Sequence, residues 1–252
     1  MSRMQTARLV EKLKPWWSGY LFYFGKPVGS AHGELAGIRI LVACAVLELW
    51  LRPACRDLIQ WLGVPGRLWS GLALVTLVLA LALGICRLWI RMPFANLGLF
   101  GWRKWSSAER CFFPQLLVIS LIAFVAMQSK TLRQIPEHSA WVQSVLVILS
   151  WQLIWGFYQE LVYRGLLQTE LVRRWGPVAG ILISNLLFTF GPLHAYHLSS
   201  AFANPGHLSI FAGIFVIGLY FGIIFYRSGN LWMIGLLHGV GDFFIDGLAM
   251  MN

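Results

Sequence analysis

The chain has 252 residues, of which 58% are hydrophobic and only 12% are charged. A soluble fold carries charge on about a quarter of its residues, so this composition excludes a disordered protein and argues against an ordinary soluble domain. It is typical of a polytopic membrane protein, because each crossing of a bilayer takes about 20 apolar residues. Lys and Arg outnumber Asp and Glu by 20 to 10. They lie in the breaks between apolar runs, where membrane topology places them, so we expect no nucleic-acid partner.

Residues 1–35 form a basic segment that differs from the rest of the chain. Four Lys and Arg residues precede an aromatic patch at 16–24. The patch is too short to span a bilayer and has no small-residue cleavage site, so we expect it to lie in the membrane interface. Residues 36–252 are expected to form a single transmembrane bundle. The predicted fold class is therefore an all-α, polytopic membrane helix bundle.

The apolar runs predict about seven membrane-spanning helices, within a range of six to eight. The weakest run is interrupted by Arg39 and Glu48. No charged residue occurs within 175–226, a length that suits two helices divided near 191–206, where Gly, Pro, Ser and His collect. The predicted spans are 36–51, 68–86, 111–128, 139–159 with helix continuing through Arg164, two within 175–226, and one from 230 to 250.

The basic residues also set the predicted orientation. With the N-terminus in the cytoplasm, fourteen Lys and Arg residues fall in inside segments and five in outside segments. This bias agrees with the positive-inside rule. We therefore expect an integral protein of the bacterial cytoplasmic (inner) membrane with a cytoplasmic N-terminus.

Several ionisable side chains lie where the chain is otherwise apolar. Glu160 and Arg164 are four residues apart and so share a helix face, and the same spacing joins His238 and Asp242. His194 follows a Gly-Pro pair in a third segment. A charge at the bilayer centre costs about 2.5–3.5 kcal/mol on insertion scales, so such groups indicate function by default. We expect three helices to bring them to one shared, water-containing cavity.

Purely structural roles are open for the same groups. Glu160 and Arg164 can form a buried ion pair without chemistry, and His238 with Asp242 can simply join two helices. His194 can lie at a wet end of a loop.

Three further residues are given structural roles. His197, three residues after His194, is expected to be a loop histidine. Glu170 and Arg174, again four apart, are predicted to form a solvated pair on a helix face.

Three short stretches together resemble the CPBP family of intramembrane proteases, which includes CAAX-processing endopeptidases and bacteriocin-processing proteases. That family carries Glu-Glu-x-x-x-Arg, then Phe-x-x-x-His, then His-x-x-x-Asn/Asp, on three membrane helices. The matching stretches here are 159–164, 190–194 and 238–242, in the same order. The resemblance covers about residues 141–247, which we expect to be a protease-like core.

The resemblance implies an all-α bundle that hydrolyses a peptide bond within or beside the bilayer. In the family, the first glutamate and the first histidine are taken to activate a water, and the last histidine and Asn/Asp to stabilise the oxyanion. Carried over, His194 would orient water and Arg164 would fix a carboxylate. His238 and Asp242 would steady the tetrahedral intermediate.

One departure from the family pattern is Gln159, which stands at the position of the first glutamate. An amide cannot accept a proton from water. Either Glu160, about 100° further around the helix, is the base after a small rotation, or His194 is the base and Gln159 positions the water. The third outcome is an inactive relative. We expect retained activity.

The predicted function is that of an intramembrane endopeptidase, with a water activated by Glu160 and His194. Its substrate would be the membrane-proximal or C-terminal segment of another membrane-associated protein, as in CAAX or C-terminal sorting-signal processing. The alternative is a catalytically inactive scaffold or immunity-type factor on the same fold. A transporter is a further alternative, against which the lack of an internal repeat argues.

A zinc site competes with the metal-free mechanism. His194, His238, Asp242 and Glu160 include suitable zinc ligands, and a spacing of four residues suits two ligands on one helix. The sequence has no His-Glu-x-x-His motif. We therefore expect no cofactor and a glutamate-type mechanism, with zinc as the alternative.

Overall fold

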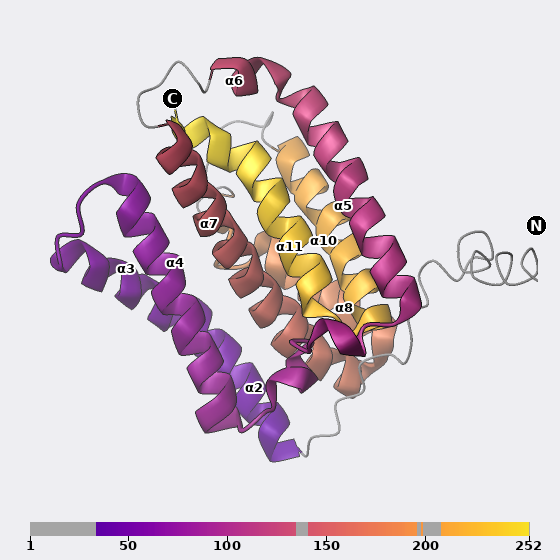
Figure 1. Ribbon diagram of the computed structural model, residues 1–252. Helices are drawn as coiled ribbons and strands as arrows, with labels where there is room; N and C mark the ends of the chain where they lie inside the picture. Colours follow the sequence, from indigo (N-terminus) through magenta and orange to yellow (C-terminus); the bar gives the residue numbers. More distant parts are fainter. Residues whose placement is uncertain (1–33, 135–140, 196–197, 199–207, 252) are drawn as a thin grey trace, which may run out of the picture.

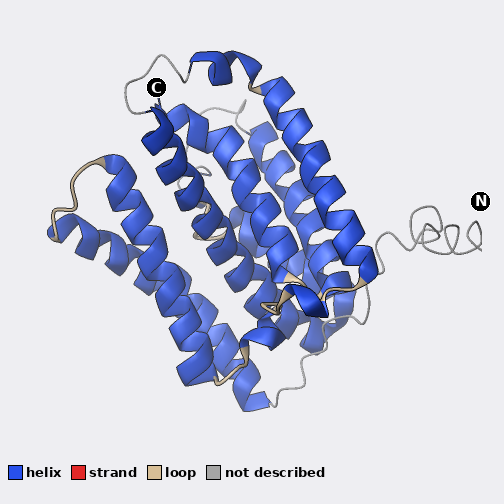
Figure 2. Cartoon of the chain, viewed as in Figure 1, coloured by secondary structure: helices blue, strands red, loops and turns tan. Residues whose placement is uncertain are grey.

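The computed structural model describes residues 34–134, 141–195, 198 and 208–251. Within these ranges every regular element is a helix (Figure 2). The predicted all-α bundle is therefore confirmed. The aromatic patch at 16–24 and His197 lie outside the described residues.

The bundle is built from nine α-helices joined by short 3₁₀- and π-helical segments within the described ranges (Figure 1). The elements are α2 (Glu34–Val46), η2 (Leu47–Leu51), α3 (Arg52–Trp61), α4 (Arg67–Gly84), η3 (Ile85–Ile90), η4 (Phe94–Leu97), η5 (Trp102–Lys104), α5 (Ser107–Met127), α6 (Ser129–Gln134), α7 (Trp141–Glu160), η7 (Leu161–Gln168), α8 (Thr169–Phe190), α10 (Leu208–Ser228), α11 (Leu231–Asp242), η9 (Phe243–Gly247) and η10 (Leu248–Met251).

Five helical stretches of the described chain are long and apolar enough to cross a membrane. The 50-residue stretch among them contains both α7 and α8, and so covers two of the predicted spans. The first predicted span, 36–51, is helical but is not among the five. The five stretches are Arg67–Ile90, Ser107–Met127, Trp141–Phe190, Ser209–Ser228 and Leu231–Met250.

A sharp change of backbone direction separates the two legs of the longest stretch. Gly176 has φ 78° and ψ 171° inside α8, a conformation that glycine adopts far more readily than other residues. Pro177 follows, and proline suits the first turn of a new helix. The leg that begins there ends at Phe190, and α10 begins at Leu208, which confirms two helices divided near 191–206.

The central helix of the bundle is α7, which packs against α11 on one side and α4 on the other (Figure 1). Two glycines allow α7 and α11 to approach closely. A Cβ atom added at Gly156 would lie 2.6 Å from the backbone nitrogen of Gly239, and one added at Gly239 would lie 2.6 Å from Cα of Leu153. The end of α7 is thereby held within reach of the side chains of α11.

We predict that Gly239→Ala lowers the melting temperature of the detergent-purified protein, because the added methyl group forces two backbones apart. Overpacking of this kind costs about 1–3 kcal/mol. The matched control is Gly213→Ala in α10, where an added Cβ meets nothing within 4 Å. Equal melting temperatures for the two variants would show that the α7–α11 contact does not need a glycine.

Candidate active site

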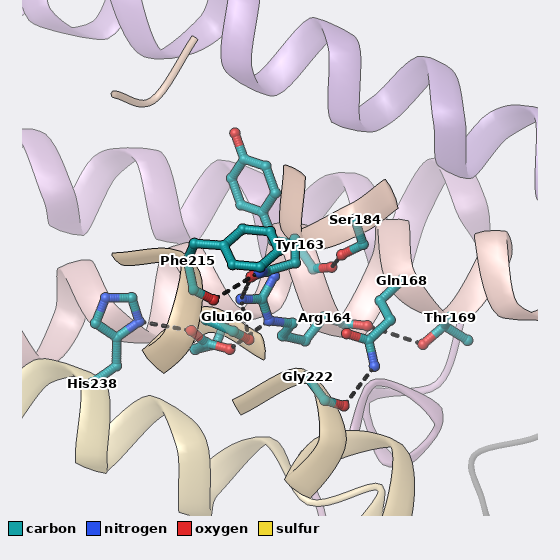
Figure 3. A network of polar contacts seen from close by, with 11 residues as sticks. Glu160, Tyr163, Arg164, Gln168, Thr169, Ser184, Phe215, Gly222 and His238 are labelled. Carbon is teal, nitrogen blue, oxygen red and sulfur yellow. Dashed lines mark hydrogen bonds and ion pairs between the residues drawn. The ribbon is translucent and has the colours of Figure 1, made fainter. Parts of the chain in front are cut away.

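A buried ion pair lies at the end of α7. Arg164 Nε is 3.5 Å from Glu160 Oε2, and both side chains are 0% exposed (Figure 3). The other carboxylate oxygen, Oε1, lies 2.7 Å from Nδ1 of His238 on α11. A carboxylate accepts, so the His238 ring donates through Nδ1. The predicted sharing of a helix face by Glu160 and Arg164 is thus seen, and α11 adds the third member of the cluster.

The Arg164 guanidinium is held by two further helices. Its Nη2 donates to the Gly218 carbonyl at 2.9 Å and to Asn185 Oδ1 at 3.3 Å, and its Cζ lies 4.7 Å from the centre of the Phe188 ring. Asn185 in turn donates to the Phe215 carbonyl at 2.9 Å. A buried charge is tolerated when it is paired and hydrogen-bonded. One arginine therefore ties α8 and α10 to the end of α7.

The segment that carries Arg164, η7, is π-helical, and all of its residues are buried. Several of its polar groups are bonded to neighbouring elements (Figure 3). Gln168 donates to the Gly222 carbonyl at 2.9 Å, and Ser184 donates to the Tyr163 carbonyl at 2.9 Å. π-Helical turns occur frequently at functional sites.

Gln159 also faces α11. Its Nε2 donates to Asp242 Oδ2 at 3.4 Å, and the same oxygen lies 3.6 Å from Nε2 of His238. The two nitrogens of one imidazole are thus flanked by two carboxylates. Their exposure differs, since the Asp242 side chain is 22% exposed and that of Glu160 is fully buried. Asp242 is therefore the more exposed carboxylate of this cluster.

His194 approaches the cluster through the ring of Phe188. The centres of the His194 and Phe188 rings are 5.1 Å apart, and those of Phe188 and His238 are 5.9 Å apart. His194 Nδ1 lies 2.7 Å from the Phe188 carbonyl. Since a carbonyl only accepts, Nδ1 carries the proton, and Nε2 is the basic nitrogen of the neutral ring. His194 thus contacts the same aromatic ring as His238 and Arg164.

The structure contradicts one predicted role. Glu170 was expected in a solvated pair with Arg174, yet it is 0% exposed. It accepts from Arg173 at 2.7 Å and from Arg174. It is buried because the start of α2 packs over it at Gly37. Sequence spacing identifies the pair but not the helix that covers it.

Glu34 at the start of α2 completes this second charged cluster. It pairs with Arg173 at 2.9 Å and with Arg174 at 3.1 Å. The hydrogen bond from Arg173 holds the pKa of the Glu34 carboxyl below its usual value. The contact therefore favours the folded state at neutral pH and is lost as the pH falls through the folded-state pKa.

The sequence did not single out Asn185 and Phe188 as members of the site. Asn185 is 1% exposed within a long uncharged run. A lone amide inside an apolar helix needs a hydrogen-bond partner, and this signal in the sequence could have identified Asn185. Phe188 has no such signal, because a phenylalanine in an apolar helix is ordinary.

The four candidate zinc ligands do not form a metal cluster. Among the described residues, no group of three or more His, Cys, Asp and Glu side chains is arranged to hold an ion. Glu160 and Asp242 lie beside opposite nitrogens of the His238 ring. His194 contacts the ring of Phe188, which also contacts that of His238.

Comparison with known protein families gives one match. Residues 141–244 match the family described as Type II CAAX prenyl endopeptidase Rce1-like. Comparisons with curated proteins and with solved structures give no significant match. The matched region covers less than half of the chain and includes all three motif stretches. This part of the chain is thus similar to CAAX-type endopeptidases, which confirms the resemblance to the CPBP family.

We predict that Glu160→Gln destabilises the protein, because it leaves the buried Arg164 charge uncompensated. Breaking a buried pair in this way costs about 3–5 kcal/mol. The double variant Glu160→Gln with Arg164→Met should recover much of that loss, since it removes both charges. Thermal unfolding in detergent measures both effects.

The control for this substitution is Glu34→Gln, which also weakens contacts with arginines but at an exposed site. It should change the melting temperature little. If Glu160→Gln behaved like this control, the Glu160–Arg164 pair would contribute nothing to stability.

Proposed function

We propose that this protein is an intramembrane endopeptidase that cleaves the membrane-proximal or C-terminal segment of another membrane-associated protein. The observation that carries the proposal is the meeting of Glu160, Arg164, His238 and Asp242 at one buried site inside the region that matches the protease family. Such a cluster costs free energy in an apolar bundle, so it indicates a function by default.

The proposed location is the bacterial cytoplasmic membrane, with the N-terminus in the cytoplasm. Basic residues at one end of the bundle support this orientation. Arg103 and Lys104 lie in η5, just before α5, and Arg227 lies at the end of α10. A hydrogen bond between the starts of α5 and α11 places these ends together, since Asn230 donates to Glu109 at 2.9 Å. Positive charge marks the cytoplasmic side.

We further propose that Asp242, rather than Glu160, takes the proton of the attacking water. The sequence favoured Glu160 and His194, but Glu160 is fully buried and engaged by Arg164 and His238. In the family pattern, the first glutamate supplies a carboxylate and the last position an amide or a carboxylate. Here the amide is Gln159 and the carboxylate is Asp242, in contact at 3.4 Å. The contact supports an exchange of the two groups between the helices.

In the proposed reaction, Asp242 accepts a proton as the water oxygen bonds to the carbonyl carbon of the scissile peptide. The tetrahedral oxyanion is stabilised by an N–H of Gln159 and by protonated His238, and one such donor contributes about 10²–10³ in rate. His194 orients the water through its basic Nε2. The proton then passes to the leaving amine nitrogen as the carbon–nitrogen bond breaks.

The exchange predicts a non-additive pair of variants. Asp242→Asn should lower kcat by about 10²–10⁴, because it removes the base. Adding Gln159→Glu to that variant should restore most of the activity, because the carboxylate returns to the other side of the same contact. Cleavage is measured on membrane-anchored reporters that end either in a prenylated CAAX tail or in an unmodified apolar tail. His194→Ala serves as a comparison that removes a different group.

Two outcomes would contradict the proposed base. Asp242→Asn with wild-type activity would return the role to Glu160 or His194. An inactive Asp242→Asn that Gln159→Glu fails to rescue, although the double variant melts like the wild type, would assign Asp242 to oxyanion binding alone. If the wild type cleaves none of the reporters but retains them in pull-down, the inactive scaffold on the same fold becomes the better description.

We also propose that the reaction needs no metal. Dialysis of the purified protein against a strong chelator should leave cleavage unchanged. Loss of activity that returns on addition of zinc alone would instead support the ligand set His194, His238, Asp242 and Glu160.

A further inference from the structure

Another buried carboxylate lies outside the region that matches the protease family. Glu48 in η2 is only 5% exposed. Its Oε1 accepts from the Tyr158 hydroxyl of α7 at 2.7 Å, and its Oε2 lies 3.5 Å from Arg52 Nε. Tyr158 directly precedes Gln159 in the chain. The amino-terminal helices are therefore joined to the central helix by a polar contact next to the candidate active site.

Arg52 extends this contact to the turn that carries His194. Its Nη2 donates to the Pro192 carbonyl at 3.1 Å, across 140 residues of sequence. Pro192 lies two residues before His194, and the backbone nitrogen of His194 donates to the Gly191 carbonyl at 3.1 Å. The turn after α8 is thus bonded both to itself and to α3.

The chemistry of these groups favours a positioning role over simple packing. A buried carboxylate costs free energy unless it is hydrogen-bonded and paired, and an apolar residue at 48 would fill the same space without that cost. Glu48 orients Arg52, and the fork geometry of a guanidinium allows one arginine to face a carboxylate and a carbonyl together. The carbonyl that it binds belongs to the segment that places a candidate catalytic ring.

We propose that Glu48 and Arg52 are positioning residues of the peptidase, which hold the Pro192 carbonyl and thereby keep His194 beside Phe188. The inference rests on the proposed function, because it gives this contact a role in catalysis. Neither residue touches the reacting atoms. Their effect passes through the orientation of the His194 ring.

The first test is kinetic. Arg52→Ala should lower kcat at least about tenfold with KM nearly unchanged, because a displaced catalytic group slows chemistry more than binding. Arg52→Lys, whose ammonium can reach the same carbonyl, should recover part of the loss. The matched control is Arg56→Ala on the same helix, since Arg56 pairs at 3.5 Å with its neighbour Asp57 and both are largely exposed. It should behave as the wild type.

The second test reads the turn directly and needs no activity. Leu193→Cys is introduced together with Cys111→Ser, which removes the exposed native thiol. Maleimide labelling at 193 should rise about fivefold when Arg52→Ala is added, as expected for the loss of one hydrogen bond. It should not change when Arg56→Ala is added.

The outcomes separate this inference from the proposed function. If the wild type cleaves its reporters while Arg52→Ala matches it in kcat, the positioning role is wrong and the proposed function stands. A fall in kcat without a rise in labelling also overturns the inference. If the wild type cleaves no reporter, the proposed function fails and the positioning role fails with it. A fall in kcat, a rise in labelling and rescue by lysine together support it.

Discussion

The site is organised around the Glu160–Arg164 ion pair, which is fully buried in an apolar bundle. Moving two charges out of water costs several kcal/mol each, and hydrogen bonds to the pair offset part of this cost. The carboxylate therefore takes a hydrogen bond from His238, while the guanidinium donates to Asn185 and Gly218. These contacts come from α8, α10 and α11, so the need to satisfy one pair fixes the arrangement of the helices around the site.

The sequence predicts the helices and much of the site because both depend on local patterns. The spacings of Glu160 to Arg164 and of His238 to Asp242 identify two helix faces, and the run of Gly and Pro after Phe190 identifies the end of α8. What cannot be predicted depends on contacts between distant segments. The burial of Glu170 requires α2 to lie over it, and the bond from Arg52 to Pro192 joins residues 140 positions apart.

With a cytoplasmic N-terminus, the predicted spans put Glu160 near the inner face of the membrane, at the end of 139–159. They put His194 near the outer face, at the end of the next span, and these positions are hard to reconcile with a shared site. Two features of the fold remove the difficulty. Helix continues beyond Glu160 through η7 into α8, so Glu160 lies well inside a longer helical segment than 139–159. After α8 the chain turns back, and His194 Nδ1 donates to the Phe188 carbonyl six residues earlier. Both changes bring the two residues toward the same level.

The same constraint bears on the proposed base, given that residue 159 is a glutamine. In the proposed mechanism Glu160 keeps its contacts with Arg164 and His238, since giving up either would leave a buried group without its partner. A carboxylate can be supplied at low cost only from a position that is partly exposed and already in contact with residue 159. Asp242 meets both conditions, since its side chain is 22% exposed and accepts from Gln159. In the proposed mechanism, the burial of the ion pair thus restricts where the reactive carboxylate of this bundle can lie.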